Sequence, residues 1–483
     1  MPLPPARTPL AELSPTIALG ALDGRYRGAV APLVDHLSEA ALNRARLHVE
    51  VEWLLHLVQH EVVPGAPGLS EQERSALRAL VVDFDADAID ELRAIEAETV
   101  HDVKAVEYFL RGRLTALLAG SGAEGAARAE ALGQLIHFAC TSEDINNTSY
   151  ALMVQGAVQE VWLPRARALV GQLAAMARDL AEVPLLAHTH GQPATPTTMG
   201  KELAVLAHRL RRQLGRVEGA AYLGKLNGAT GTYGAHVEAV PGADWQRLSK
   251  DFVEHLGLTW NPLTTQIESH DWQAELYADV ARFNRILHNL ATDVWTYISM
   301  GYFAQVRGQG TVGSSTMPHK VNPIRFENAE ANLEVSNALL DVLASTLVTS
   351  RLQRDLTDSS MQRNAGTALG HSLLALDNVS RGLAGLDAVP EAMAADLDAN
   401  WEVLAEPVQS VMRALAARGV EGMSNPYERL KELTRGRRIG QAELVEFVRG
   451  LGLPTQEEER LVALTPATYV GLAPDLVEHL GEA

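Results

Sequence analysis

The sequence predicts an all-α protein, and three observations lead to that prediction. Hydrophobic residues make up 47% of the 483 residues, whereas aromatic residues make up only 5%. Alanine and leucine dominate the apolar residues, and both favour helices, while the β-branched and aromatic residues that favour strands are sparse. Apolar residues also recur at helical spacing over long stretches in the middle of the chain.

Five long amphipathic helices are expected from this spacing. They cover approximately residues 164–180, 203–217, 273–305, 326–347 and 364–383. The third would be about 50 Å long at 1.5 Å per residue. Helices of this length indicate an elongated bundle. Their wide apolar stripes further predict that bundles from several subunits pack together.

Three domains are expected along the chain. They are an N-terminal helical domain (1–130), a central helical bundle (131–383) and a small C-terminal helical domain (384–483). The stretch 306–325 is rich in glycine, serine and proline between two long helices, so it is expected to be a loop that opens and closes. Residues 115–131 are rich in small residues and are expected to be an inserted linker.

Composition and charge exclude several classes of function. The formal net charge of −19 argues against a nucleic-acid partner, because phosphate binding needs a basic face. An anionic small substrate stays possible at a local basic site. The single cysteine, Cys140, excludes an internal disulfide framework and a cysteine-based zinc cluster. No signal peptide and no run of about 20 apolar residues is evident, so a cytoplasmic protein without a membrane partner is expected.

The segment 313–323 places hydroxyl groups, a lysine and an asparagine on the expected loop. An ordinary connector between helices is the plain alternative. The overlapping stretch 308–313 matches the pattern G-x-G-x-x-G, but a dinucleotide-binding turn must follow a strand and open a helix. A long helix is expected before it and no strand pattern is visible, so dinucleotide binding is rejected.

The segment 189–196 places His190 on an expected loop between two helical segments, with two prolines that restrict it. A histidine held in this way suits proton transfer near neutral pH. Two alternatives stay open at this point. His190 could be a structural residue, or it could bind a metal together with His188, although no third ligand stands at a helpful spacing.

Three polar clusters could bind an anion. Thr141 and Ser142 precede a helical pattern, so they either cap that helix or bind a carboxylate or phosphate there. The segment 101–104 combines a histidine, an aspartate and a lysine. The segment 351–363 carries three arginines among poor helix formers, so a bent or interrupted element is expected, with either a phosphate-binding role or a solvated charged face.

Taken together, these motifs resemble the adenylosuccinate lyase family of the fumarase/aspartase superfamily. The pattern Gly-Ser-Ser-x-Met-Pro-x-Lys-x-Asn-Pro at 313–323 resembles the superfamily signature, and His319 within it is typical of adenylosuccinate lyases. The resemblance covers nearly the whole chain and is closest to the longer bacterial form. The other matching segments are 23–26, 101–107, 137–144, 189–196, 264–268, 351–364 and 400–407.

The resemblance implies a carbon–nitrogen lyase that releases fumarate from succinylated purine nucleotides, with no cofactor and no metal. It implies a homotetramer whose central helices form a 20-helix core, with active sites shared by three subunits. By the same resemblance, Ser314 is the base and His190 the acid. The implied substrate-binding residues are Arg25, Tyr26, His101, Asp102, Thr141, Ser142, Gln266, Lys320, Asn322, Asn328, Arg354, Ser359 and Arg363.

Two positions depart from the family pattern. Val100 stands where relatives carry asparagine, so a polar contact is expected to be missing or replaced there. Thr311 stands where relatives usually carry glutamate, so loop closure is expected to be tuned differently. Neither departure touches the implied acid, base or lysine.

Three other functions were weighed against this resemblance. A sister lyase, such as an argininosuccinate lyase or a fumarase, is disfavoured by His319 and by the arginines at 354 and 363. A helical scaffold that lost catalysis is disfavoured because Ser314, His190 and Lys320 are all intact. A zinc hydrolase that uses His188 and His190 would need bound metal.

Overall fold

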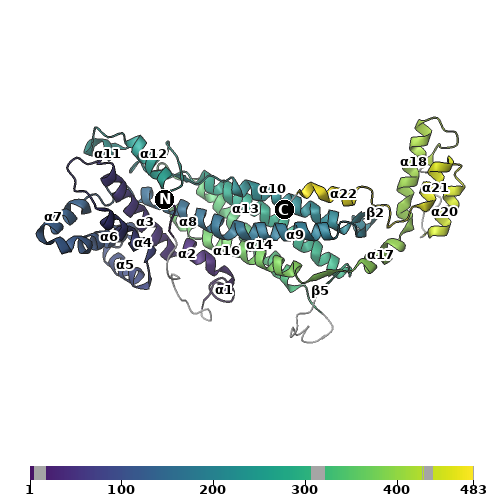
Figure 1. The fold of residues 1–483 in the computed structure, drawn as a ribbon, viewed down its shortest axis with the longest axis horizontal. Helices are drawn as coiled ribbons and strands as arrows, with labels where there is room; N and C mark the ends of the chain where they lie inside the picture. Colours follow the sequence, from purple (N-terminus) through teal and green to yellow (C-terminus); the bar gives the residue numbers. More distant parts are fainter. Residues whose placement is uncertain (5–17, 306–320, 427, 429–438, 482–483) are drawn as a thin grey trace. The chain divides into compact units, whose positions relative to one another are not determined.

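The computed structural model describes residues 1–4, 18–305, 321–426, 428 and 439–481. Within these ranges the chain is built almost entirely of helices, which confirms the all-α prediction, and its strands form three two-stranded pairs (Figure 1). The chain divides into two compact units. The first unit comprises Met1–Ala166, Gln213–Arg285 and Ala331–Asp377, and the second comprises Arg167–Arg212, Ile286–Glu330 and Asn378–Ala483. The three-domain division expected from the sequence stays a prediction.

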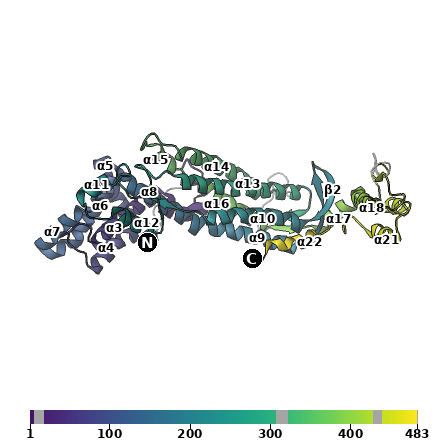
Figure 2. The ribbon, with the colours of Figure 1, turned by 90° about the horizontal axis from the view of Figure 1, so that it is seen from above.

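Most shorter helices belong wholly to one unit. Those of the first unit are α1 (Arg27–Val30), η1 (Ala31–Leu33), α2 (Val34–Leu37), α3 (Glu39–Gln59), α4 (Glu71–Val82), α5 (Ala86–Thr99), α6 (Asp102–Leu118), η2 (Ala119–Ser121), α7 (Gly122–Gly133), α8 (Ser142–Gly156), η3 (Ala157–Trp162), α11 (Gly234–Ala239), α12 (Trp245–His255) and α15 (Thr357–Gln362). Those of the second unit are α17 (Pro390–Asp398), η4 (Trp401–Leu404), α18 (Ala405–Ala417), α20 (Gln441–Arg449), α21 (Thr455–Ala463), α22 (Ala473–Leu476) and η5 (Val477–Leu480). Figure 2 labels several of these shorter helices, such as α5, α6 and α7.

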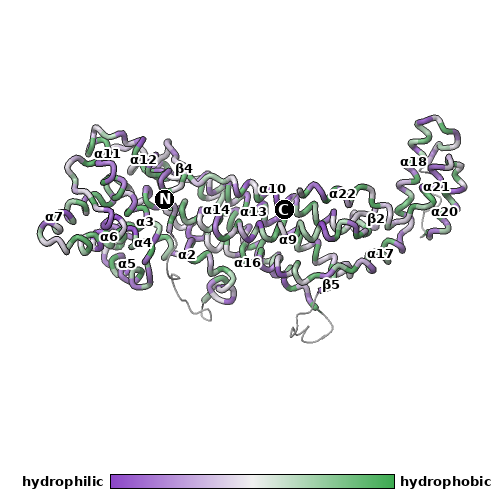
Figure 3. The backbone as a smooth tube through the Cα atoms, in the orientation of Figure 1, coloured by the Kyte–Doolittle hydropathy of each residue, from purple (hydrophilic) through white to green (hydrophobic). Residues whose placement is uncertain are grey.

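Five longer helices contribute residues to both units. They are α9 (Leu163–Asp179), α10 (Met199–Glu218), α13 (Asp271–Ser299), α14 (Ile324–Leu347) and α16 (Ala365–Leu383). Hydrophobic and hydrophilic positions are interspersed along them (Figure 3), as expected for helices that bury one face. They confirm the five long helices that the apolar spacing predicts, with one correction to the length of α13.

The helix α13 ends at Ser299 rather than near Gln305. Gly301 adopts a left-handed conformation with φ 76°. The Tyr302 N–H then donates to the carbonyl of Tyr297 at 2.9 Å, and the Gly301 N–H donates to that of Ile298 at 3.0 Å. This pair of bonds is a Schellman motif, which terminates a helix. With 29 residues, α13 is about 43 Å long.

Residues 115–131 are also helical, so the expectation of an inserted linker was wrong. They cover the end of α6, the short helix η2 and most of α7. Alanine is the strongest helix former among the residues concentrated here, which is why a composition of small residues gives helix rather than loop.

The bundle helices are joined by polar contacts in each unit. In the first unit, the Asn284 amide of α13 donates to Ser336 of α14 at 3.1 Å, and the Ser336 hydroxyl donates to the Ala368 carbonyl of α16 at 2.7 Å. In the second unit, the Asn378 amide of α16 donates to Asn328 of α14 at 3.0 Å. The Gln172 amide of α9 donates to the Ser380 carbonyl of α16 at 3.0 Å.

The strands form three separate pairs. The pair β1 (Pro184–Thr189) and β2 (Gln192–Thr198) is antiparallel, with Pro184 opposite Thr198 and an irregularity between Leu186 and His188. The pair β3 (Leu223–Gly224) and β4 (Thr259–Trp260) is parallel. The pair β5 (Phe303–Gln305) and β6 (Leu386–Ala388) is antiparallel. The strand β5 precedes the G-x-G-x-x-G stretch where no strand was expected, but its antiparallel pairing is not that of a βαβ unit.

The core of the first unit lies around α3, which is buried on nearly every side. Trp53 and Leu54 are inaccessible to solvent, and so are several polar positions of the same helix. In the second unit, a separate apolar cluster holds the C-terminal helices together; it includes Trp401, Met412, Leu444 and Val448. Among the described helices, none is long and apolar enough to cross a membrane.

Candidate active site

The turn between α5 and α6 fixes the position of His101. The Val100 N–H donates to the Glu96 carbonyl at 2.8 Å, and Val100 takes the left-handed conformation with φ 53° that closes the helix. The next residue, His101, caps α6, because its Nδ1 accepts the Lys104 N–H at 3.3 Å. The imidazole is half-exposed beside Asp102. The departure at Val100 therefore lies at a backbone position where asparagine or glycine costs less than valine.

A buried arginine, Arg46, anchors the Asp102 carboxylate. Its Oδ2 lies 2.6 Å from Nη2 of Arg46, and its Oδ1 accepts the Val103 N–H at 2.9 Å. Burial alone raises the pKa of this carboxyl group, but the charge of Arg46 and these hydrogen bonds outweigh it, so the pKa is lowered. Asp102 is therefore a carboxylate at neutral pH, with a third of its side chain exposed.

At the start of α8, Thr141 is the N-cap residue, which is one of the alternatives expected for this segment. Asp144 accepts the Thr141 N–H at 2.8 Å, and Ser142 is the first helical residue. The Asp144 carboxylate is fully buried and pairs with Nζ of Lys225 at 2.8 Å. It also accepts the Asn227 N–H at 2.9 Å. One carboxylate thus joins the N-terminus of α8 to the loop that follows β3, and it holds the backbone of Thr141 in place.

Arg354 and Gln266 lie side by side although they are far apart in the sequence. Nη2 of Arg354 donates to Oε1 of Glu143 at 2.9 Å, and its Nη1 lies 3.4 Å from Oε1 of Gln266. The Gln266 amide in turn donates to the Ala229 carbonyl at 2.9 Å. Arg354 precedes α15, which has only six residues, so the interrupted element predicted for 351–363 is confirmed.

Arg363 lies at the edge of the same region. Its guanidinium contacts both carboxylate oxygens of Glu39, at 3.0 and 3.1 Å, and Nη2 lies 3.8 Å from Oδ2 of Asp102. Its Nη1 donates to the Ser359 hydroxyl at 3.0 Å. The bond to Glu39 raises the pKa of Arg363. This ion pair is partly exposed, so an anionic ligand could replace Glu39 without leaving a buried charge unpaired.

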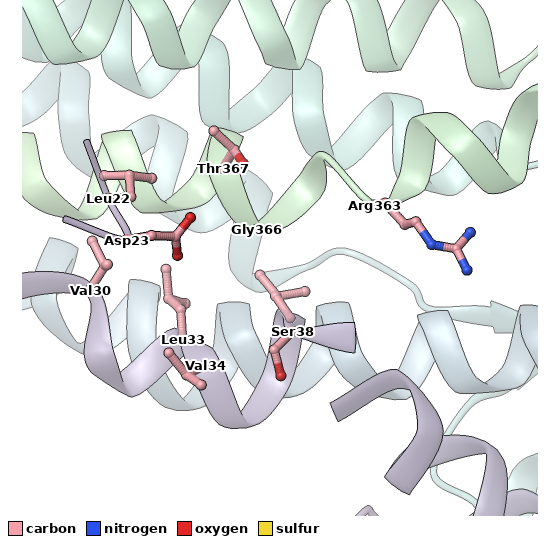
Figure 4. A pocket seen from close by; sticks show the side chains of 10 residues that line it. Leu22, Asp23, Val30, Leu33, Val34, Ser38, Arg363, Gly366 and Thr367 are labelled. Carbon is pink, nitrogen blue, oxygen red and sulfur yellow. The ribbon is translucent and has the colours of Figure 1, made fainter. Parts of the chain in front are cut away.

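A cavity of about 150 Å³ adjoins Arg363 between α2 and α16. Figure 4 shows Asp23, Leu33 and Thr367 around it, with the Arg363 guanidinium directed away from Asp23. Next to Asp23 along the chain, the guanidinium carbon of Arg25 lies 5.9 Å from the centre of the Tyr26 ring. The cavity walls are mixed: the apolar side chains of Leu22, Val30, Leu33, Val34 and Leu37 line it together with the polar side chains of Asp23, Ser38, Arg363 and Thr367.

His190 lies at the tip of a β-hairpin, so the expected loop at 189–196 was wrong. Thr189 pairs with Gln192, which leaves His190 and Gly191 as a two-residue turn. Their φ angles are 54° and 72°, as in a type I′ turn. The hairpin was not expected because Pro193 and Pro196 lie within β2, and prolines interrupt a strand pattern. The imidazole is exposed at the tip.

The remaining predicted residues of the second unit lie near the start of α14. Asn322 is exposed just before this helix. Asn328 is in its first two turns, where its side chain accepts a hydrogen bond from Asn378. Ser314, Lys320 and Thr311 lie outside the described residues.

The first unit brings most of the predicted binding residues together, whereas His190, Asn322 and Asn328 belong to the second unit. Sequence reasoning missed the buried residues that hold the first group. They are Arg46, Glu143, Asn146 and Lys225. The signal for Arg46 and Glu143 was weak, because charged residues on a helix usually mark a solvated face. In the described part of the chain, no group of three or more His, Cys, Asp or Glu side chains could hold a metal ion.

Comparison with solved structures shows which known proteins share this fold. A fumarate lyase from Mesorhizobium sp. BNC1 matches with a TM-score of 0.71 at 19% identity, covering 93% of this chain and 97% of that chain. A 3-carboxy-cis,cis-muconate lactonizing enzyme from Pseudomonas putida matches with a TM-score of 0.66 at 20% identity, covering 92% and 96%. At these identities the likeness is one of fold. A lyase family model matches residues 24–336.

Sequence relatives narrow the class to one family. A model of the adenylosuccinate lyase C-terminal region matches residues 350–470. The adenylosuccinate lyase of Escherichia coli K12 is 46% identical over 469 residues, covering 97% of this chain and 100% of the relative. That of Legionella pneumophila Corby is 43% identical over 461 residues, covering 95% and 98%. The chain belongs to the adenylosuccinate lyase family.

Proposed function

We propose that this chain releases fumarate from adenylosuccinate to give AMP, and from the succinylated aminoimidazole carboxamide ribotide SAICAR to give AICAR. The observation that carries this function is the 46% identity to an adenylosuccinate lyase over essentially both whole chains. The clustered arginines of the first unit support it, because a nucleotide substrate brings a phosphate to an otherwise acidic protein.

The reaction is a β-elimination with two proton transfers. A base removes the proton beside a carboxylate, and an acid protonates the leaving purine nitrogen. We assign Ser314 as the base and His190 as the acid. The carbanion is an aci-carboxylate whose added charge needs hydrogen-bond donors, and Lys320 and Asn322 are the residues assigned to the succinyl carboxylates. A serine hydroxyl becomes an effective base only in a dry, electropositive setting, which Lys320 and loop closure would supply.

The binding residues divide between the parts of the substrate. His101 and Asp102 are assigned to the phosphate end or to the orientation of the site, and Thr141, Ser142 and Gln266 to substrate contacts. The other residues assigned to the nucleotide or its phosphate are Arg25, Tyr26, Asn328, Arg354, Ser359 and Arg363. The partly exposed pairing of Arg363 with Glu39 supports an exchangeable anion site.

We also propose that the enzyme is a cytoplasmic homotetramer whose active sites take residues from three subunits. The superfamily fold and the exposed position of His190 at a hairpin tip support this assembly. The three-domain division at residues 130 and 383 is part of the same proposal. Sedimentation at the mass of a 52.2 kDa monomer would contradict the tetramer.

An absorbance assay with adenylosuccinate tests the function, with fumarate measured in parallel. Wild-type protein should consume substrate with stoichiometric fumarate. Ser314→Ala should lower kcat by about 10³-fold or more while AMP still binds, because only the proton transfer is lost. Near-normal turnover by this variant would remove Ser314 as the base. A folded wild type that fails on adenylosuccinate but acts on argininosuccinate or malate would be a sister lyase instead.

A further inference from the structure

Arg46 of α3 is a buried cation, and two of its hydrogen bonds lead toward residues of the proposed site. Its side chain is 1% exposed. Nη2 donates to Asp102 at 2.6 Å, Nε donates to Oδ1 of Asn146 at 2.9 Å, and Nη1 donates to Oδ1 of Asn43 at 3.0 Å. The planar guanidinium therefore fixes three acceptors from three directions, which a lysine ammonium on a flexible stem cannot reproduce.

The hydrogen bond from Arg46 to Asp102 is the first arm of this arrangement, and it supports the turn before α6. The charge-assisted bond from Arg46 sets the rotamer of Asp102. The backbone N–H of Val103 holds the second oxygen of this carboxylate. His101 lies directly beside it, with Nδ1 at 3.6 Å from Oδ1 of Asp102. The carboxylate that Arg46 fixes is therefore the one that stands against the exposed histidine.

The second arm is the chain of hydrogen bonds from Arg46 to Arg354, which passes through two side chains of α8. The Asn146 carbonyl accepts from Arg46, so its amide group faces away and donates to Oε1 of Glu143 at 2.9 Å. The same Glu143 oxygen accepts from Nη2 of Arg354 at 2.9 Å. Glu143 and Asn146 are both buried, so neither can turn toward water without breaking this chain of bonds.

We propose that Arg46 is a positioning residue for the lyase reaction, which holds Asp102 directly and Arg354 through Asn146 and Glu143. It touches no substrate. The inference rests on the proposed function, in which Asp102 and Arg354 bind the nucleotide. Both arms start from one guanidinium, so a change at Arg46 displaces two substrate contacts that are separated by 252 residues in the sequence.

Arg44 gives a matched control on the same helix. It is 2% exposed and also donates through both terminal nitrogens, but to backbone carbonyls, those of Pro4 at 2.9 Å and Asp35 at 3.0 Å. Replacing either arginine by lysine keeps the buried charge and removes the guanidinium geometry. The two variants therefore share the general cost of disturbing α3 and differ in whether Asp102 and Asn146 lose their anchor.

The experiment compares Arg46→Lys with Arg44→Lys by adenylosuccinate kinetics and by calorimetric binding of AMP. Arg46→Lys should lower kcat/KM about 10- to 100-fold, mostly through KM, with a matching loss of AMP affinity, because misplaced binding groups weaken substrate binding and orientation. Arg44→Lys should keep wild-type kinetics even if its thermal unfolding temperature falls. Equal kinetics for the two variants would overturn the proposal.

Asn146→Asp separates the two arms. The substitution keeps an acceptor for Arg46 but sets a second carboxylate against Glu143 in place of the amide donor, so the arm to Arg354 is broken while the arm to Asp102 stays. The loss of AMP affinity should be smaller than for Arg46→Lys. In a double-mutant cycle with Arg354→Gln, Asn146→Asp should add little further loss. A fully additive cycle would contradict the relay.

Crystal structures of the two lysine variants give a readout that does not depend on turnover. In Arg46→Lys the side chains of Asp102 and Asn146 should leave their present rotamers, and in Arg44→Lys they should keep them. An inactive wild type would reject the proposed function, while unchanged rotamers in Arg46→Lys would reject the positioning role. The two failures are therefore distinguished.

Discussion

Two histidines stand in tight turns of this protein, and their surroundings differ. His101 caps a helix, lies beside a carboxylate, and that carboxylate is held by the buried Arg46. His190 occupies a two-residue hairpin turn, and within the described residues of its unit no hydrogen bond to its ring is found. Among the described residues, the backbone of β1 and β2 sets its position.

This difference indicates that the proposed binding residues and the proposed acid are positioned in different ways. The binding side of the first unit is preorganised by charges that the chain supplies itself, so its geometry should survive in the free enzyme. The proposed acid is instead placed at an exposed tip by backbone conformation. Its effective environment must then come from substrate, from the loop at 306–325, or from another subunit of the proposed tetramer.

The largest expected effect comes from His190→Asn, which removes the acid and keeps the turn. Asparagine followed by glycine is the preferred sequence for a type I′ turn, so the hairpin should keep its shape. We expect kcat to fall about 10²- to 10⁴-fold, the usual contribution of a general acid. The pH profile of kcat should also lose the limb that reports this acid.

AMP affinity is the control for this variant. It should stay near the wild-type value, because the hairpin is not assigned to the nucleotide. An unchanged pH profile would reject His190 as the acid. A thermal unfolding temperature well below that of the wild type would instead mean that the imidazole has a structural role, and the contrast with His101 would fail.

A smaller effect is expected at a third histidine, His137, which adopts a left-handed conformation as His190 does, with φ 57°. Its ring Nδ1 lies 2.6 Å from Oε1 of Glu50, and its backbone N–H donates to the other Glu50 carboxylate oxygen at 3.1 Å. Burial lowers the pKa of His137, but the bond and charge of Glu50 and the charge of Glu107 outweigh it, so the pKa is raised above 6.5. This histidine is anchored by carboxylates, as His190 is not.

A raised pKa makes the contribution of His137 to stability depend on pH. The contribution is complete below about pH 6.5, where both folded and unfolded chains are protonated. It is lost as pH rises through the raised pKa, because only the folded chain then binds the proton. Urea denaturation across this range should show a slope of at most about −1.4 kcal/mol per pH unit from this group. His137→Asn, which tolerates the same φ, should flatten the slope; an equal slope in both proteins would contradict the anchoring.

The sequence predicted the long helices better than the buried residues that hold the proposed binding residues in place. The long helices were visible because each buries one apolar face. The helix α3 was not, because it buries Arg46, Glu50 and other polar residues on nearly every side. Tertiary partners far along the chain, such as Asn146 for Arg46 and His137 for Glu50, satisfy those groups, and a single sequence does not reveal such pairings. The hairpin at His190 was missed because its prolines indicate a loop.

The smallest predicted effect comes from Val100→Gly. This substitution tests whether the strained backbone before His101 is needed for function. Val100 has φ 53° and is 87% exposed. The left-handed conformation costs about 1–2 kcal/mol for an ordinary residue, and a β-branched side chain is among the least suited to it. Val100→Gly removes this cost but adds roughly 0.5–1 kcal/mol of chain entropy to the unfolded state. We expect the free energy of unfolding to rise by about 1 kcal/mol or slightly less in urea denaturation.

The kinetics of Val100→Gly test whether the turn at His101 differs from the hairpin turn at His190 in how its histidine is held. Arg46 and the cap to Lys104 hold His101 and Asp102 independently of Val100, so KM for adenylosuccinate should stay within about twofold of the wild type. Matched substitution of Val100 by alanine keeps the strain and removes the branch, and it should change stability less than glycine does. If glycine raised KM several-fold, the backbone at Val100 would orient His101 much as the hairpin orients His190, and the anchor at Arg46 would not be sufficient.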